Sequence, residues 1–265
     1  MTRSRRALLR DLGLALGACA APAALQGCAA ARAQLRPPDA PVHLGWRWLP
    51  GDALRFATRL ALVRPDGWTL HTALWRYVAT ELRQDGTITL LATQQGVDAQ
   101  RGRGPLPPRA LPPRVEPLAN VPVRFAVDGR MPLPDGDTLD DRLAHLMLGM
   151  ALPPYGVRPG DAWPDPGLLV PFLSLLPPSL PVTSQSRTTL ESLEPAVGSW
   201  RAKLAHSARL RTVPGGPTLL LRGSTLWQAE PGLVIDRWVE VRMSPDAATG
   251  DPAVGTLRAE LWHTP

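Results

Sequence analysis

From residue 42 onwards, apolar and polar side chains alternate along much of the chain. A period of two is typical of a β-strand with one buried and one solvated face. The stretch Arg237-Trp238-Val239-Glu240-Val241-Arg242-Met243 is representative. This pattern predicts a mainly β protein built of antiparallel meanders, arranged as a curved sheet, a half-barrel or a sandwich.

Turn residues divide the alternating stretches into separate strands. Asp66-Gly67 and Asp85-Gly86 lie between such stretches, which is a strong signal for a β-hairpin. A further apolar run, Leu168–Leu176, is bounded by prolines. We expect strands at 55–63, 68–82, 87–92, 123–127, 182–193, 200–211, 218–228, 233–243 and 256–263.

The stretch 101–122 interrupts this pattern with seven prolines, at positions 105, 107, 108, 112, 113, 117 and 122. Proline cannot donate to a strand ladder, so we expect an extended crossing rather than a strand. Two interpretations remain open. The stretch is either a solvated crossing loop or a docking strap for a partner protein.

One helix is predicted, from Thr138 to about Met150. Its apolar residues recur at helical spacing, Asp137 can cap its first turn, and Pro153-Pro154 ends it. The tetrapeptide Pro50-Gly51-Asp52-Ala53 recurs as residues 159–162. We therefore expect a single β-rich domain over 42–265, with a first half at 42–127, this central amphipathic helix, and a related second half at 157–265.

The first 33 residues have the three parts of an export signal: arginines, a short apolar run and a boundary of small residues. Arg5-Arg6 resembles the twin-arginine signal, with Leu8 where that signal usually has Phe. Leu25-Gln26-Gly27-Cys28 resembles a lipobox, which implies acylation of Cys28 and, with Ala29 after it, sorting to the outer membrane. Cys19 and ordinary cleavage after Ala33 are the alternatives.

Both cysteines lie in this N-terminal segment, so we expect no disulfide in the mature chain. The formal net charge is +6, and removal of the four Arg and one Asp of residues 1–27 leaves +3. No basic cluster interleaved with aromatics is present, so nucleic acid is not an expected partner. The expected location is the periplasmic face of the cell envelope, with a lipid anchor to the membrane.

The sequence contains no recognisable catalytic motif. A nucleophile elbow, a His-Glu-x-x-His metal site, a phosphate loop and a dinucleotide fingerprint are all absent from it. The five histidines, at positions 43, 71, 145, 206 and 263, are not at metal-binding spacing. Asp135, Asp137, Asp140 and Asp141 fit a capped helix start better than a calcium loop. We therefore expect no catalytic residue, metal or cofactor. A catalytic Ser-His-Asp triad formed by residues far apart in sequence would not be visible as a motif.

Tryptophan is the dominant aromatic residue, with nine Trp against three Phe and two Tyr. The tryptophans are spread over nearly every expected strand. We interpret them as packing residues of the core and sheet faces. The alternative is that several of them line a cavity for an apolar or sugar-like ligand.

Together these features resemble a bacterial exported lipoprotein. The mature part is similar to uncharacterised periplasmic β proteins and, more distantly, to the lipoprotein-carrier fold, a curved antiparallel sheet covered by helices that binds acyl chains. The resemblance implies a non-catalytic envelope protein that holds an apolar ligand between a Trp-rich sheet and a helical lid. A structural or partner-binding envelope protein without ligand is the alternative, and an unrecognised hydrolase is a third.

Overall fold

The structure is a computed structural model. It describes residues 40–82, 88–113, 121–125, 150–168, 182–196, 199–212, 218–230, 232–244 and 255–264. These residues form ten strands and one short 3-10 helix, η1 (Pro166–Leu168). The strands are β1 (Ala53–Arg64), β2 (Gly67–Leu82), β3 (Ile88–Gly102), β4 (Val121–Phe125), β5 (Ala162–Trp163), β6 (Val182–Ala196), β7 (Ser199–Thr212), β8 (Thr218–Gln228), β9 (Leu233–Ser244) and β10 (Thr256–Thr264).

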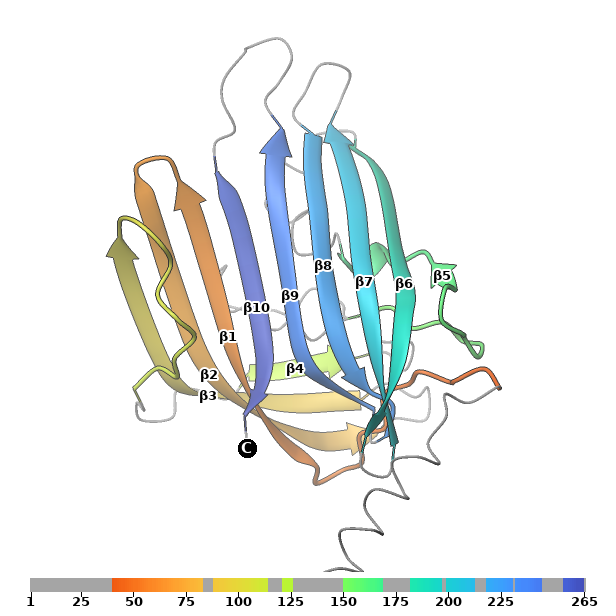
Figure 1. Cartoon of the computed structure of the whole chain (residues 1–265). Helices are drawn as coiled ribbons and strands as arrows, with labels where there is room; N and C mark the ends of the chain where they lie inside the picture. Colours follow the sequence, from red (N-terminus) through yellow and green to blue (C-terminus); the bar gives the residue numbers. More distant parts are fainter. Residues whose placement is uncertain are drawn as a thin grey trace, which may run out of the picture. The chain divides into compact units, whose positions relative to one another are not determined.

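All ten strands belong to one sheet, in the order β4-β3-β2-β1-β10-β9-β8-β7-β6-β5 (Figure 1). Every neighbouring pair is antiparallel. The chain thus forms two meanders. One runs outward from β1 and the other returns inward to β10. The two meet at the centre of the sheet, where Arg55–Val63 pairs with Thr256–Thr264.

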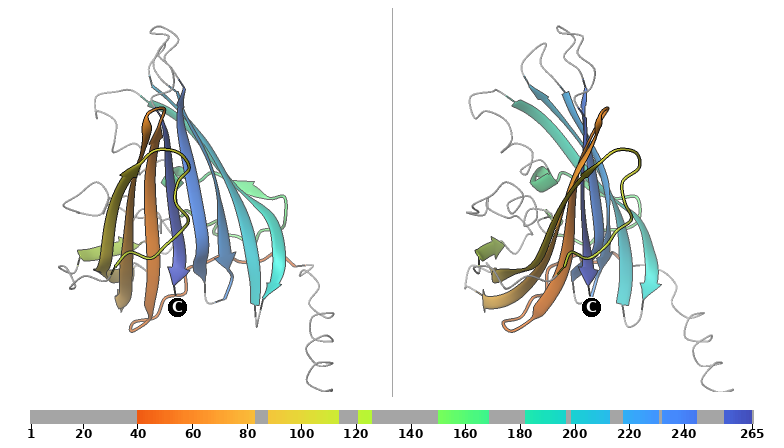
Figure 2. Two further views of the ribbon diagram at one scale, coloured as in Figure 1. Left: turned by 60° about the vertical axis from the view of Figure 1, so that its left-hand side comes forward. Right: turned by 90° about the vertical axis from the view of Figure 1, so that its left-hand side faces the viewer.

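The sheet is strongly curved, and the part of β3 that pairs with β4 runs almost across the other strands (Figures 1 and 2). The register shifts between Leu74 and Trp75 and between Ala79 and Glu81 on β2, opposite β3. Such β-bulges bend a strand and increase its twist. Further shifts occur at Leu190/Ser192 on β6 and at Leu226/Trp227 on β8.

The two faces of the sheet differ in chemistry. Most of the core side chains lie on the concave face, and they include Phe56, Tyr77, Leu190, Leu204 and Leu261, all fully buried. The convex face carries ion pairs and is crossed by residues 103–113, which we call the strap (Figure 2). This division follows the period-two pattern of the strands.

The strand predictions are confirmed for nearly the whole sheet. β8 has the bounds expected, and the observed bounds of most other strands differ by three residues or fewer at each end. The strand expected at 87–92 is the exception, because β3 continues to Gly102. The Pro-rich crossing therefore begins at residue 103 rather than 101.

The expected helix at 138–150 lies outside the described residues, apart from Met150. Met150 is fully buried and is not helical. The described residues contain no α-helix, so the prediction of a central helix is not supported. Of the expected lid run 168–176, only Leu168 is described, and it is buried at the end of η1.

The two Pro-Gly-Asp-Ala segments have the same conformation. Gly51 and Gly160 have φ angles of 97° and 96°. The amides of Leu49 and Arg158 donate to Asp52 and Asp161 Oδ2 at 2.7 and 2.8 Å. Each turn also exchanges two backbone hydrogen bonds with a neighbouring strand, at Ala79 on β2 and Leu190 on β6. Both anchor points lie at β-bulges, so the sequence repeat is also a structural repeat.

Candidate functional site

Tryptophan side chains gather in the core of the concave side. Trp46, Trp48, Trp75, Trp163 and Trp227 are each at most 8% exposed. Trp46 meets Trp227 edge-on, with ring centroids 4.6 Å apart, and lies 6.2 Å from Trp48. Edge-to-face contacts of this kind add to the stabilisation from burial alone. The prediction that the tryptophans pack the core is confirmed for these five.

Trp46 and Trp48 do not belong to a strand. They lie on the segment 40–52, which leads into β1 and is joined to the rest of the fold by few polar contacts. Val42 and Val157 exchange backbone hydrogen bonds of 2.8 and 2.9 Å, and Arg47 forms an exposed ion pair with Glu230 at 2.9 Å. The segment therefore covers part of the core without being fixed by a strand ladder.

A narrow apolar void separates this segment from β3. Trp46, Trp48, Ile88 and Leu90 line it. The space is too narrow to hold a water molecule. An unfilled apolar space costs contact energy, and an apolar group that entered it would recover that energy.

Farther along the concave side, four polar residues form one hydrogen-bonded chain. Thr188 Oγ1 donates to Asp165 Oδ2 at 3.0 Å, and it lies 2.8 Å from His206 Nδ1. His206 Nε2 lies 2.6 Å from Thr225 Oγ1. All four residues are at most 3% exposed. Buried polar groups are stable only when they are hydrogen-bonded in this way.

The direction of each bond in the chain follows from counting protons. The single Thr188 hydroxyl proton goes to Asp165, so Thr188 Oγ1 must accept from His206 Nδ1–H. Neutral His206 then has a lone pair on Nε2, which accepts the Thr225 hydroxyl proton. His206 is therefore the Nδ1–H tautomer, and every proton in the chain points towards Asp165.

Arg237 of β9 completes this cluster on the concave face and is 2% exposed. Burial lowers the pKa of Arg237 to about 10, and the charge of Asp165 partly opposes that shift. The pKa of His206 lies well below its ordinary value because of burial and the nearby Arg237 charge. His206 is thus held neutral between two threonines.

The cluster attaches the segment 150–168 to the sheet. Asp165 Oδ1 accepts from the Ala151 amide at 3.2 Å, and Trp163 Nε1 donates to the Ala151 carbonyl at 2.9 Å. Thr225 is hydrogen-bonded to His206, which is linked through Thr188 to Asp165. This order of groups resembles that of a nucleophile and its general base. The hydrogen bonds of the cluster join β6, β7 and β8 to residues 150–168, and we assign it this structural role.

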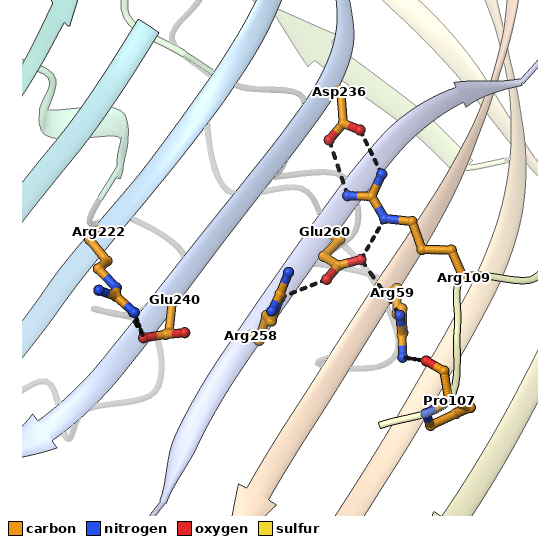
Figure 3. Close-up of polar contacts among 8 residues, drawn as sticks. All are labelled: Arg59, Pro107, Arg109, Arg222, Asp236, Glu240, Arg258 and Glu260. Atoms are coloured by element: carbon orange, nitrogen blue, oxygen red, sulfur yellow. Dashed lines mark hydrogen bonds and ion pairs between the residues drawn. The ribbon is translucent and has the colours of Figure 1, made fainter. Parts of the chain in front are cut away.

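On the convex face, Glu260 of β10 is the centre of an ionic cluster (Figure 3). Its two carboxylate oxygens meet three guanidinium groups: Arg258 Nε at 2.6 Å, Arg109 Nε at 2.8 Å and Arg59 Nη1 at 3.8 Å. Glu260 and Arg59 have side chains only 4% and 8% exposed. This face also holds a second, more exposed group, in which Glu240 accepts from Arg222 and Arg242.

The strap is bound to this cluster. Arg59 Nη2 donates to the Pro107 carbonyl at 2.5 Å, and Arg109 donates to both oxygens of Asp236 at 2.6 and 3.1 Å (Figure 3). The Arg109 guanidinium also lies 5.1 Å from the Trp262 ring centroid, in a cation–π contact. Hydrogen bonds to Asp236 and Glu260 raise the pKa of Arg109.

Gly96 of β3 lets the strap lie close to the sheet. A Cβ atom at this position would come within 2.6 Å of the Pro113 carbonyl oxygen. Most of residues 103–113 are exposed, as expected for a solvated crossing loop, but the loop is fixed to the sheet at several points. This part of the Pro-rich stretch is packed on the sheet through buried charges.

The candidate residues from the sequence fall partly outside the described ranges. The residues outside the described ranges are Arg5, Arg6, Cys28, His145 and the acidic group at 135–141. Of the other histidines, His43 is exposed, His71 and His263 are half-buried, and His206 is buried. No three metal-binding side chains gather within the described ranges, and no described helix has the length and apolar character to cross a bilayer.

Sequence reasoning missed the partners of His206 and Arg59. Thr188, His206, Thr225 and Arg237 occupy positions where the alternation places buried side chains. Polar residues at such inward positions are the signal that points to a network. The hydrogen-bond partners themselves are far apart in sequence and depend on the register of four strands.

No protein-family model and no curated protein matches the chain. Among solved structures, the chain is similar to DynF from the dynemicin biosynthesis pathway of Micromonospora chersina. The identity is 10%, the TM-score is 0.20, and the comparison covers 86% of this chain and 91% of DynF. A TM-score of this size carries no argument about fold or function.

Proposed function

We propose that the protein is a non-catalytic lipoprotein of the cell envelope that holds an apolar ligand on the concave side of its curved sheet. The observation that carries the proposal is the void between Trp46, Trp48, Ile88 and Leu90. It lies where the segment 40–52 covers the first residues of β3, at Ile88 and Leu90. An apolar ligand would enter there by displacing the segment, without breaking a strand ladder.

The physical basis is the aromatic content of this side. An indole buries about 150–250 Å² of surface and has a flat face that adapts to an acyl chain or a ring. Small-molecule sites are mostly apolar and concave. The void does not admit even a water molecule, so the proposal requires that Trp46 and Trp48 move when the ligand binds.

The proposal includes the export signal and the lipid anchor expected from the sequence. Arg5 and Arg6 would direct export, and acylated Cys28 would hold the domain at the periplasmic face of the outer membrane. Cleavage at Cys19 or after Ala33 remains the alternative. A lid at 138–150 and descent of the two halves from one ancestral unit also belong to the proposal. The matching turns at Gly51 and Gly160 support common descent.

The ligand can be tested with a bromine-labelled fatty acid, because bromine quenches indole fluorescence only on close approach. We expect saturable quenching in the unmodified chain. Leu90→Trp should weaken the binding at least tenfold, because the larger side chain fills the void. The matched control is Leu220→Trp, at a residue of β8 that is 47% exposed. Unsaturable quenching, or equal binding by the two variants, would contradict the proposal.

The partner-binding alternative is supported by the strap, which presents a rigid Pro-rich ridge with Leu111 56% exposed. Crosslinking in intact cells tests it. A partner captured through a photoreactive residue at position 111, and absent when that residue is placed at 220, would favour this second function. Saturable fatty-acid binding without any captured partner would exclude it in favour of the first.

A further inference from the structure

A second cavity lies at the end of the sheet where β1 turns into β2. It has a volume of about 580 Å³ and is lined by Leu62, Arg64, Asp66, Gly67, Trp68, Thr69, Arg101, Gly102 and Arg103. The register pairs Leu62 with Thr69 and Thr69 with Arg101, which places these three side chains on one face. The hairpin and the first residue of the strap thus contribute to one site.

The side chains of the three arginines of this cavity have no acidic partner among the described residues. Arg47, Arg59, Arg109, Arg222, Arg242 and Arg258 each form an ion pair with a carboxylate. The side chains of Arg64, Arg101 and Arg103 form no ion pair or hydrogen bond with any described residue, and all three residues are exposed. Asp66 is the one acid in the lining, so the cavity has a formal charge of +2.

Trp68 lies on the other face of the hairpin, because successive side chains of a strand point to opposite faces. It is half-buried, and its ring lies across Gly102 on the neighbouring strand. A Cβ atom at Gly102 would come within 2.5 Å of Trp68 Cζ2. The glycine is therefore required for the position of the indole.

We propose that this cavity binds a phosphate-bearing ligand, with the phosphate held by Arg64, Arg101 and Arg103. Guanidinium groups match the geometry of phosphate oxygens and form paired hydrogen bonds with them. The Thr69 hydroxyl can donate one more. Both a free phosphate ester and a phospholipid headgroup have this chemistry. The site is separate from the apolar void at Leu90 and does not depend on it.

The test measures two probes against the purified full chain. Calorimetry with glycerol phosphate reports binding of a free ester. Sedimentation with vesicles of phosphatidylglycerol or phosphatidylcholine reports binding of a headgroup. The fraction of protein bound to phosphatidylglycerol minus the fraction bound to phosphatidylcholine measures the charge-dependent binding. The test variant combines Arg64→Gln with Arg101→Gln. The control is Arg209→Gln, an exposed arginine of β7 that forms no ion pair with a described residue.

We expect the double arginine variant to weaken binding of one probe at least tenfold. Loss confined to glycerol phosphate identifies a free ester as the ligand, and loss confined to phosphatidylglycerol identifies a headgroup. Failure of the unmodified chain to bind either probe would overturn the proposal. An equal loss in Arg209→Gln would overturn it as well, because it would show that net charge alone is responsible. The fatty-acid test at Leu90 is unaffected by either result.

Discussion

Arg109 and Asp236 lie 127 positions apart in the chain, yet two nitrogens of one guanidinium donate to both oxygens of one carboxylate, at 2.6 and 3.1 Å. This paired contact joins the strap to β9, while Arg109 Nε reaches Glu260 on β10. This one side chain thus fixes the loop to two strands, in addition to the contact of Arg59 with the Pro107 carbonyl. The prolines keep the loop extended, so few residues are needed to hold it.

Arg109→Ala is expected to loosen the strap. The side chain is 36% exposed, so solvent screens part of its charge, and we expect a loss of about 1–2 kcal/mol in the free energy of unfolding. Cleavage by trypsin after Arg101 or Arg103 should become at least several-fold faster. Urea unfolding and timed proteolysis measure the two effects. Arg209→Ala is the control, and equal proteolysis of the two variants would contradict the role of Arg109.

Glu260→Ala is expected to be more damaging than Arg109→Ala. It leaves Arg59 buried, with a side chain 8% exposed, and without its carboxylate. Removing one partner of a buried pair costs about 3–5 kcal/mol. The matched control is Glu230→Ala, which removes an ion pair whose side chains are 55% and 60% exposed, and should cost about 1 kcal/mol or less. Similar unfolding midpoints for the two variants would show that burial of the cluster is unimportant.

Acid is expected to destabilise the fold through His206. Burial lowers the pKa of His206 in the folded state, whereas the unfolded chain takes up a proton near pH 6.5. Unfolding therefore binds a proton below that pH, and the free energy of unfolding falls as the pH drops. Half-buried His263 has a pKa shifted in the same direction and adds to the effect.

His206→Gln separates this contribution from the others. The variant should be less stable at pH 7, since its amide cannot match both threonines. Its stability should depend less steeply on pH between about 6.5 and 4.5, by up to about 1.4 kcal/mol per pH unit. Urea unfolding at several pH values provides the measurement. Exposed His43→Gln should keep the original slope. An unchanged slope in His206→Gln would rule out His206 as the source.

Gly232→Ala tests how the segment 40–52 rests on the turn between β8 and β9. Gly232 has a φ of +83°, and a Cβ atom there would collide with the Gly45 carbonyl oxygen. We expect a loss of about 1–3 kcal/mol in the free energy of unfolding. Gly45→Ala is the matched control, because nothing lies within 4 Å of a Cβ atom at that position. A larger loss in Gly45→Ala than in Gly232→Ala would contradict this packing.

Local signals in the sequence were sufficient to predict most of the strands. Alternation sets the bounds of β8, and Asp66-Gly67 marks the hairpin in which Gly67 has a φ of +153°. The repeat of Pro-Gly-Asp-Ala predicts two turns of one geometry because proline fixes one backbone angle and glycine permits the next. These features depend on neighbours in the chain, so they can be read from it.

The contacts between distant segments could not be read in the same way. β3 was expected to end at residue 92 because Gln94, Gln95 and Gly96 interrupt the apolar pattern. In the structure Gly96 continues the strand and makes room for Pro113. Arg109, Glu260 and Asp236 look like ordinary surface charges in the sequence. Their convergence depends on the order β1-β10-β9, which local patterns do not encode.

The pairing of β1 with β10 has a consequence for how the protein is made. A ribosome that has released β1 to β9 has produced two meanders whose central edges both await β10, and unpaired strand edges invite aggregation. Contacts this far apart in sequence also form slowly. Synthesis must therefore reach residue 256 before β10 can join the two meanders into one sheet. Any chaperone that attends this protein would act on a nearly finished polypeptide.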